Sequence, residues 1–258
     1  MKVIAISNQK GGVAKTTATI NIGAVMASQG YKVLIIDLDA QGNASHGLGF
    51  TKEQLNNMVS IFDCIVQDTP LPIVDAITKT DYDNLYLVPS NYKMKDAEPL
   101  LTTVMGRELL LKESITSCYD QLDFDYILLD FPPALGVVSL NGLIVADEVL
   151  IPVNGNYALE GINDLLETIK RVKRKFNPSL NICGAFFSMY SIGNEIKAIL
   201  DELQNYFGDK MFKTYIRKSV KVEEAAGRGK PVVHYAPYSN PSLDYKALTK
   251  EVLEHVEG

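Results

Sequence analysis

The sequence is poor in cysteine and has no long apolar run, and both scarcities limit what this protein can be. Its 258 residues include three cysteines, Cys64, Cys118 and Cys183, which lie far apart and are odd in number. This usage argues against a disulfide framework and against a clustered metal site. No apolar stretch approaches the ~20 residues that span a bilayer. The chain passes from Met1 directly into a predicted strand, without a signal peptide pattern, so we expect a cytoplasmic protein.

Positive charge is scarce only in the first part of the chain. The whole sequence has 25 basic and 31 acidic residues, a net charge of −6. Residues 1–150 carry 10 basic and 18 acidic side chains, whereas residues 151–258 carry 15 and 13. A surface that binds a polyanion is therefore expected in the second part.

Apolar runs alternate with helical patterns along the chain, and they predict an α/β fold. Several of these runs are almost continuously apolar, as in strands that are buried on both faces of a parallel sheet. We expect a single domain over residues 1–258, a mostly parallel twisted sheet with helices on both faces and ligands at the carboxyl ends of its strands. The last helix is predicted at 242–256. Strands are predicted at 3–7, 32–37, 85–89, 126–130, 148–153, 181–187 and 211–216.

A phosphate-binding loop is predicted between the strand at 3–7 and a helix from Thr17 to Gln29, which Gly30 would terminate. In such a loop the backbone N–H groups and the helix N-terminus point at anionic oxygens. Lys15 would reach the β- and γ-phosphates, and the Thr16 hydroxyl would contact Mg²⁺. A glycine-bearing turn before an ordinary helix is the alternative, but the strand–loop–helix context favours phosphate binding. The segment, called the P-loop below, reads Lys10-Gly11-Gly12-Val13-Ala14-Lys15-Thr16-Thr17.

The P-loop departs from the ordinary pattern, which has glycine where this chain has Gln9 and Ala14. The pattern K-G-G-x-x-K-T resembles the ParA/MinD branch of P-loop ATPases. In that branch the first lysine, here Lys10, reaches across a dimer to the partner's nucleotide. The resemblance thus implies an ATP-dependent homodimer and catalytic roles for Lys10 and Lys15, with Gly11 to Thr17 binding the nucleotide. We expect Ala14 to replace the family's glycine with a negative φ.

A second motif places two carboxylates at the end of the strand at 32–37. It reads Asp37-Leu38-Asp39-Ala40-Gln41-Gly42-Asn43, called switch I below. It resembles the family's D-x-D-x-Q-G-N segment, which implies that Asp39 orients the attacking water and that Asp37 holds the metal site. A polar strand end that caps a loop is the alternative interpretation.

A third motif is a run of apolar residues that ends in Asp130, the form of a Walker B strand. The Asp130 carboxylate would hold a Mg²⁺-bound water. The residues after it, Phe131 to Gly136, are called switch II below because they resemble that part of the family. Gly136 is expected to bring a backbone N–H close to the γ-phosphate.

Two basic clusters lie in the second part of the chain. No acid occurs within residues 210–222, and the following segment, 222–232, resembles the family's E-A-x-x-x-G-K-P-V region, near which the DNA-contacting arginines lie. The resemblance predicts DNA contacts from Arg217, Lys218 and Lys221, with a solvated surface as the alternative. The cluster at 170–175 fits DNA contact and a solvated helix end equally well.

The resemblance covers nearly the whole chain and implies a ParA-type partitioning ATPase of the small form that lacks an N-terminal DNA-binding domain. Such a protein binds ATP and Mg²⁺, dimerises and binds DNA without sequence preference in the cytoplasm, on the nucleoid. It releases DNA after slow hydrolysis, which a ParB-like centromere-binding or cargo-adaptor protein stimulates. Its cargo would be a plasmid or chromosome, and no membrane contact is expected.

Other members of this branch fit the sequence less well. A MinD-like membrane switch needs a basic amphipathic helix at its end, whereas residues 250–258 are acidic. A nitrogenase-type iron protein needs paired cluster cysteines, and a tyrosine autokinase needs a tyrosine-rich tail beyond Tyr245. A positioning ATPase for a protein cargo and a protein that binds a nucleotide without hydrolysing it remain as alternatives.

Overall fold

One twisted sheet organises the described part of the chain. The computed structural model describes residues 1–66, 70–155, 158–191 and 193–257. The strand order across the sheet is β3-β4-β2-β5-β1-β6-β7. β3 pairs antiparallel with β4, and the other pairings are parallel. The strands are β1 (Lys2–Ile6), β2 (Val33–Asp37), β3 (Thr78–Lys79), β4 (Leu85–Val88), β5 (Tyr126–Asp130), β6 (Glu148–Val153) and β7 (Asn181–Phe187).

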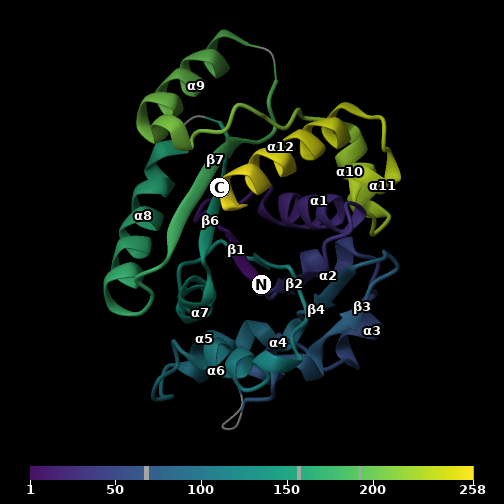
Figure 1. The fold of residues 1–258 in the computed structure, drawn as a ribbon, viewed down its shortest axis with the longest axis vertical. Helices are drawn as coiled ribbons and strands as arrows, with labels where there is room; N and C mark the ends of the chain where they lie inside the picture. The colour runs from purple at the N-terminus through teal and green to yellow at the C-terminus, as the bar shows by residue number, and fades with distance from the viewer. Residues whose placement is uncertain (67–69, 156–157, 192, 258) are drawn as a thin grey trace.

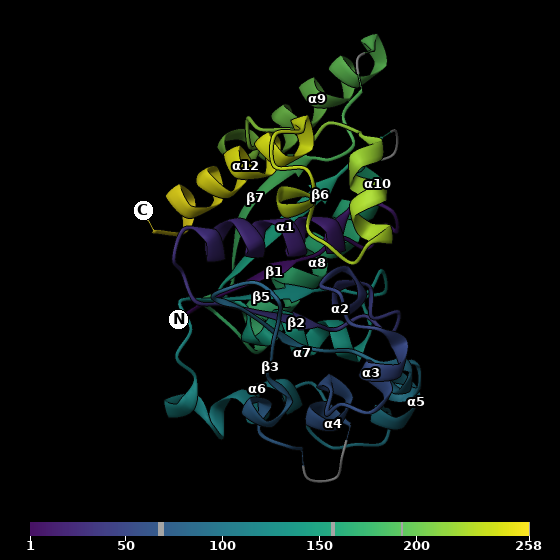
Figure 2. The same cartoon turned by 90° about the vertical axis from the view of Figure 1, so that its right-hand side faces the viewer.

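Helices cover both faces of this sheet (Figures 1 and 2). One apolar core joins the sheet to the layer of α1 and α12, and the other joins it to the layer of α4 to α8. Within the described residues, no helix has the length and apolar character to cross a bilayer. The α-helices are α1 (Lys15–Ser28), α2 (Asn43–Gly47), α3 (Lys52–Asn56), α4 (Ile61–Ile65), α5 (Ala97–Leu101), α6 (Leu110–Thr116), α7 (Val137–Val145), α8 (Ala158–Lys175), α9 (Asn194–Phe207), α10 (Val220–Gly227), α11 (Val232–Tyr235) and α12 (Asn240–Glu257).

The predicted α/β architecture is confirmed, and the burial of the central strands explains why the sequence pattern predicted it. Val33 to Ile36 in β2 and Ile127 to Leu129 in β5 are all fully buried, as expected for strands with helices on both faces. The register of β2 on β5 pairs Asp37 with Asp130. Two carboxylates predicted to act together therefore end neighbouring strands at the same edge of the sheet.

The strand predicted at 211–216 is wrong. This segment runs beside β7 but forms only isolated bridges, from Met211 to Ala185 and from Arg217 to Tyr190. A continuous ladder fails because the N–H groups of residues 213 and 214 both donate to the carboxylate of Glu251 on α12, each at 2.9 Å. A tertiary contact thus takes the Thr214 N–H, the donor between Phe212 and Ile216, which both donate to β7.

Phe131 fastens α7 to the end of β5. Its ring is fully buried and lies over Gly142, where an added Cβ atom would come within 2.5 Å of the ring and 2.8 Å of Leu38. The bulky residue after Asp130 therefore packs against the helix that follows switch II, and α7 needs a glycine at this contact.

We predict that Gly142→Ala destabilises the protein by roughly 1–3 kcal/mol, because overpacking outweighs the higher helix propensity of alanine. Gly227→Ala is the matched control, since a Cβ atom there meets nothing within 4 Å. Urea denaturation of both variants measures the difference, and equal stabilities would contradict the packing argument.

Candidate functional site

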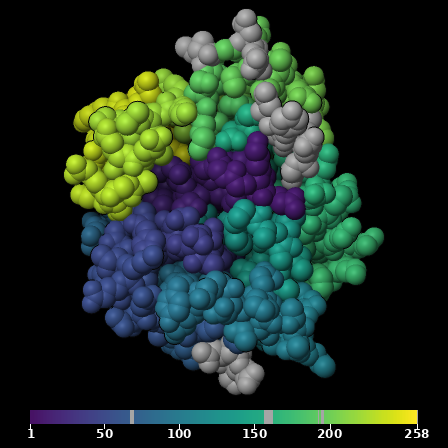
Figure 3. All heavy atoms as spheres, turned by 180° about the vertical axis from the view of Figure 1, so that it is seen from behind, coloured from purple at the N-terminus to yellow at the C-terminus, as the bar shows by residue number. Residues whose placement is uncertain are grey.

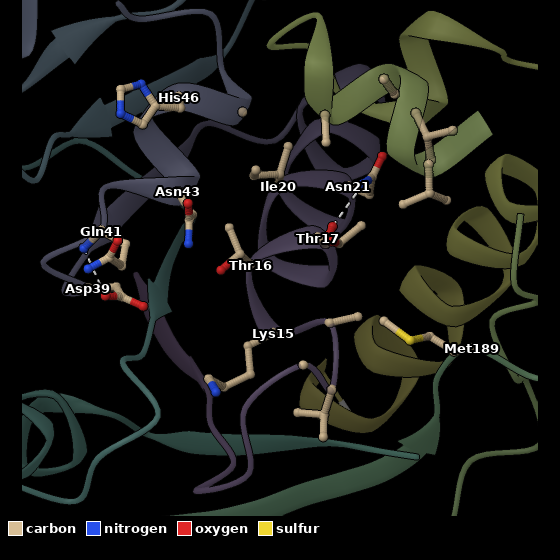
Figure 4. A pocket seen from close by; sticks show the side chains of 18 of the residues that line it. Lys15, Thr16, Thr17, Ile20, Asn21, Asp39, Gln41, Asn43, His46 and Met189 are labelled. Atoms are coloured by element: carbon tan, nitrogen blue, oxygen red, sulfur yellow. Dashed lines mark hydrogen bonds between the residues drawn. The ribbon is translucent and has the colours of Figure 1, made fainter. Parts of the chain in front are cut away.

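A cavity of about 660 Å³ opens at the carboxyl ends of the central strands. The P-loop and α1 form one wall, and switch I forms another (Figure 4). Val222 and Ala225 of α10 close a third side. Seen from behind, purple residues of the N-terminal segment stay visible between the yellow-green C-terminal region and the blue residues that follow β2 (Figure 3). The structure thus brings the P-loop and switch I to one cavity, as the motifs predict.

The first turn of α1 is bonded to the end of β5. The Thr16 hydroxyl donates to Asp130 Oδ2 at 2.7 Å, and the Thr19 hydroxyl lies 3.3 Å from Oδ1 of the same carboxylate. Lys15 is buried, and its Nζ donates to the Lys10 carbonyl at 3.2 Å. The pKa of Lys15 is lowered, because the effect of burial exceeds that of the Asp130 and Asp39 charges, which raise it. Three predicted site residues, Lys15, Thr16 and Asp130, are therefore neighbours.

Ala14 does not keep the negative φ that was expected. It is the N-cap residue of α1 and lies in the left-handed region, at φ 65° and ψ 31°. The helix begins two residues earlier than predicted, at Lys15, so the turn into it falls on Ala14. A residue with a Cβ atom pays roughly 1–2 kcal/mol in this conformation, and the P-loop of this chain is strained to that extent.

Two asparagines hold the P-loop in shape, and the sequence motifs missed them. Asn8 Oδ1 accepts from the Lys10 N–H at 2.9 Å, and its Nδ2 donates to the Pro152 carbonyl at 2.7 Å. The Asn154 side chain donates to the Gly12 carbonyl at 3.0 Å, and the Asn154 backbone carbonyl accepts from Lys10 Nζ at 3.3 Å. Asn8 could have been found, because asparagine just after a strand often forms turns. Asn154 carried no local signal.

The two switch I aspartates have different surroundings. Asp39 lines the cavity, and its Oδ1 accepts from the Gln41 N–H at 2.9 Å (Figure 4). Asp37 is fully buried and turned toward the start of α2. Its Oδ2 accepts from the N–H of Ser45 at 2.9 Å and from the Ser45 hydroxyl at 2.7 Å. Asp39 is thus placed to meet a ligand, whereas Asp37 lies behind the cavity wall.

The aspartates at the ends of β2 and β5, Asp37, Asp39 and Asp130, repel one another electrostatically. Burial raises the pKa of Asp37 to about 6, although its hydrogen bonds from Ser45 oppose the shift. Burial and the charge of Asp37 raise the pKa of Asp130 well above its usual range. A cation near Thr16 and Asp130 would relieve this repulsion, so the donors fit a hard cation such as Mg²⁺. In the described ranges, no cluster of three or more His, Cys, Asp or Glu could hold a metal unaided. Phosphate and water oxygens would complete the shell.

Switch II reaches the cavity through Pro133 and not through Gly136. Pro133 lines the cavity. Gly136 is the N-cap residue of α7 and lies against Glu98, whose carboxylate an added Cβ atom would approach to 2.2 Å. The γ-phosphate contact expected of Gly136 stays a prediction.

The three predicted DNA-contacting residues lie close together, but two of them are paired with acids, one from α12 and one from the next turn of α10. The Arg217 guanidinium is bonded to both carboxylate oxygens of Asp244, with Nε 2.9 Å from Oδ2. Lys221 Nζ lies 2.7 Å from Glu224. Lys218 is exposed and forms no ion pair within the described residues. The acid-free stretch of sequence is therefore not an acid-free surface.

The end of α8, where the other basic cluster lies, is partly neutralised. Lys170 pairs with Glu167 at 2.7 Å, and Lys173 donates to Asn181. Arg171, Arg174 and Lys175 form no ion pair with any residue that the structure describes. The structure leaves both interpretations of this cluster standing.

A smaller cavity of about 80 Å³ adjoins the P-loop at Ala14 and Thr17. Met189, Ile216 and Val222 give it an apolar lining, and Tyr245 of α12 contributes to it. The Tyr245 side chain is fully buried, and its hydroxyl has no hydrogen-bond partner. Sequence motifs gave no indication of this cavity, because its walls come from four separate segments.

Comparisons with known proteins agree with the motifs. The model of a family described as an AAA domain matches residues 1–182. The chain is 39% identical to the sporulation initiation inhibitor protein Soj of Bacillus subtilis, over 97% of this chain and 98% of that protein. It is 37% identical to the chromosome-partitioning ATPase Soj of Treponema pallidum, over 98% and 97%. A solved structure of cobyrinic acid a,c-diamide synthase from Mycobacterium smegmatis, with bound ADP and magnesium, superposes with a TM-score of 0.84 at 30% identity, over 100% and 96%.

Asp37 gives a testable dependence of stability on pH. Its folded pKa, about 6, exceeds its usual value of 3.8. As pH rises between these values, the unfolded chain releases a proton that the folded protein keeps, so this residue lowers the free energy of unfolding across that window. Asp37→Asn cannot ionise. The free energy of unfolding of the variant, minus that of wild type, should therefore rise by roughly 1–3 kcal/mol between pH 4 and pH 7. Urea denaturation at both pH values measures this, and a difference that does not change with pH would contradict it.

Proposed function

This chain belongs to the ParA/Soj family of partitioning ATPases, and from that premise we propose that it is a Mg²⁺-dependent ATPase whose nucleotide state controls its binding to DNA. The observation that carries the ATPase assignment is the hydrogen bond from Thr16 to Asp130, beside buried Lys15 at the start of α1. Lysine, hydroxyl and carboxylate in this arrangement are the protein groups that bind a nucleoside triphosphate with its metal ion.

Each residue of the cavity then has a defined task. The backbone from Gly11 to Thr17 surrounds the phosphates, and Lys15 contacts their terminal oxygens. Thr16 and Asp130 would hold Mg²⁺, and the bound ion would supply positive charge next to the phosphate oxygens. Asp39 orients the attacking water. Asp37 supports the metal site from behind, through its charge and its hold on α2.

The nucleotide base is proposed to enter the small apolar cavity beyond Thr17. Met189 and Val222 would contact the faces of the base, because apolar side chains line this cavity. The Tyr245 hydroxyl, unpartnered in the folded protein, would meet a nitrogen or oxygen of the base. This contact would offset the cost of burying that hydroxyl.

Dimerisation would follow from the exposed edge of the P-loop. Gly11 and Gly12 are exposed, so the phosphate end of the cavity is accessible to a second copy of the chain. The family role of Lys10, a contact with the partner's nucleotide, requires this accessibility. A charge-assisted contact of this kind depends on the γ-phosphate, so ATP and not ADP would hold two copies together.

DNA binding is assigned to the surface of Arg217, Lys218 and Lys221. Lys218 is its most available cation, while Arg217 and Lys221 would exchange their acid partners for phosphates. Two copies joined by ATP would present two such surfaces on one body and so raise avidity. Contacts of this type favour phosphates over base edges, which gives salt-sensitive binding with little sequence preference.

Selection of the cargo would need a second protein. The basic clusters suit phosphates and not base edges, so a ParB-like centromere-binding or cargo-adaptor protein would choose the plasmid or chromosome. It would also stimulate slow hydrolysis, and the acidic first part of the chain offers a docking surface for a basic peptide. The protein would then act in the cytoplasm, on the nucleoid. Sedimentation with DNA and separately with anionic liposomes distinguishes this from a MinD-like role on membranes.

We predict that Asp39→Ala retains ATP binding but loses turnover by about a hundredfold or more, because the carboxylate acts on water and not on the nucleotide. For this variant, light scattering should show a persistent dimer with ATP. The exposed Asp83→Ala serves as the control. Equal losses of affinity and turnover in Asp39→Ala would make Asp39 structural.

The two P-loop lysines should differ in their effects. Lys10→Ala should bind ATP and remain a monomer, whereas Lys15→Ala should lose nucleotide binding.

For DNA binding, we predict that Lys218→Glu weakens the affinity of the ATP form at least about tenfold while dimerisation is kept, because a phosphate contact becomes a repulsion. Lys112→Glu on α6, an equal charge change on another surface, should have little effect. Arg217→Glu is unsuitable, because it would place two carboxylates against each other at Asp244. Fluorescence anisotropy at several salt concentrations tests this, and binding that is insensitive to salt would count against the assigned surface.

A further inference from the structure

A carboxylate from a distant segment caps the helix that follows switch II. Glu98 lies on α5, and its two oxygens accept from the first N–H groups of α7. Val137 N lies 2.9 Å from Oε2, and Val138 N lies 3.0 Å from Oε1. These donors have no partner within the helix, and a carboxylate is favoured at the positive end of the helix dipole. The contact links residues 39 and 40 positions apart in the sequence.

Gly136 makes this contact possible. A Cβ atom at position 136 would lie 2.2 Å from Glu98 Oε1 and 2.5 Å from its carboxyl carbon. The backbone of Gly136 has φ −88° and ψ −164°, which any residue can adopt. The position needs glycine because of the space that Glu98 occupies, and not because of its backbone conformation.

Switch II is therefore held at both ends. At its start, Asp130 is bonded to Thr16, and the buried ring of Phe131 packs over α7. At its end, Glu98 fixes the first N–H groups of α7. Between these points the Ser139 hydroxyl donates to the Ala134 carbonyl at 2.5 Å, and Pro133 lines the nucleotide cavity.

Other contacts of α7 do not replace Glu98. Asn141 accepts from the Leu111 N–H at 2.9 Å and donates to the Arg107 carbonyl at 2.7 Å. These bonds hold the middle of α7 against the segment around α6, more than one turn away from the loop. Glu98 instead holds the first residues of α7, where switch II leads into the helix.

We propose that Glu98 is a positioning residue for ATP hydrolysis, which sets the place of switch II at the phosphate end of the cavity by fixing the start of α7. This inference rests on the proposed ATPase function. Glu98 touches neither the P-loop nor the cavity in the described contacts, so it would act on the rate through the loop and leave nucleotide affinity alone. Misplacement of an active-site group by about 1 Å costs up to roughly a hundredfold in rate.

Glu98→Gln tests the proposal, because each N–H group is bonded to a different carboxylate oxygen, and the amide of the same size replaces one of these acceptors with an NH₂ donor. The kcat for ATP should fall about tenfold or more, whereas KM and the affinity for Mg²⁺–ADP should stay within about twofold. Asp63→Asn is the matched control. Asp63 lies on α4 and accepts at 2.9 Å from the N–H of Ser60, the N-cap residue of that helix, but it is not among the residues that line the cavity. It should lose thermal stability without losing kcat.

Gly136→Ala supplies an independent variant, since it displaces the same carboxylate with no strain in its own backbone. It should reproduce the loss of kcat at unchanged KM. The double variant with Glu98→Gln should be no slower than the slower single variant, because both changes remove one contact. If Glu98→Gln does not fold, Gly136→Ala alone decides the matter by the same readouts.

The outcomes separate this inference from the function on which it rests. A wild-type protein that binds ATP without hydrolysing it overturns the proposed function. An active wild type whose Glu98→Gln and Gly136→Ala variants keep their kcat and lose only thermal stability, as Asp63→Asn does, overturns the positioning role alone. Equal losses of kcat and nucleotide affinity would also overturn it, because Glu98 would then act on the whole cavity.

Discussion

The hydrogen bond from Thr16 to Asp130 joins the helix after β1 to the end of β5, and the rest of the site is arranged around it. It can form because β5 lies between β1 and β2, which brings the ends of all three strands to one edge. The same arrangement pairs Asp37 with Asp130 and buries both carboxyl groups, with Lys15 near Asp130. Excess negative charge in a buried place is costly, and a metal ion with its nucleotide would relieve that cost. The fold thus places repelling carboxylates where the proposed Mg²⁺–nucleotide would lower their electrostatic free energy.

Both switches leave the sheet from this pair of strand ends, yet each is held from outside the cavity. Asp37 holds the start of α2 through Ser45, and Glu98 holds the start of α7. A carboxylate at the first turn of a helix is the common element. A displacement of α2 or α7 would therefore move the switch that leads into it.

Much of this arrangement could be predicted, because its signals are local. The apolar run from Val33 to Ile36 predicts a buried strand without any knowledge of its neighbours. The eight residues of the P-loop are sufficient to predict a phosphate-binding loop. The failures have local and distant causes. The left-handed conformation of Ala14 follows from a helix that begins two residues early. The strand expected at 211–216 is broken by Glu251, a residue almost forty positions later that takes two of its N–H groups.

The sequence by itself determined the α/β class, the phosphate-binding loop and the aspartates at the strand ends, because backbone periodicity and short-range spacing encode them. Only the tertiary structure decided which charges are available and which loops are fixed. Asp244 pairs with Arg217 in a basic cluster that is acid-free in sequence, the Asn154 side chain bonds to the P-loop from 142 residues away, and Glu98 contacts α7 across 39 positions. The physical reason is that hydrogen bonds and ion pairs act over about 3 Å in space, and chain folding sets that distance independently of separation along the sequence.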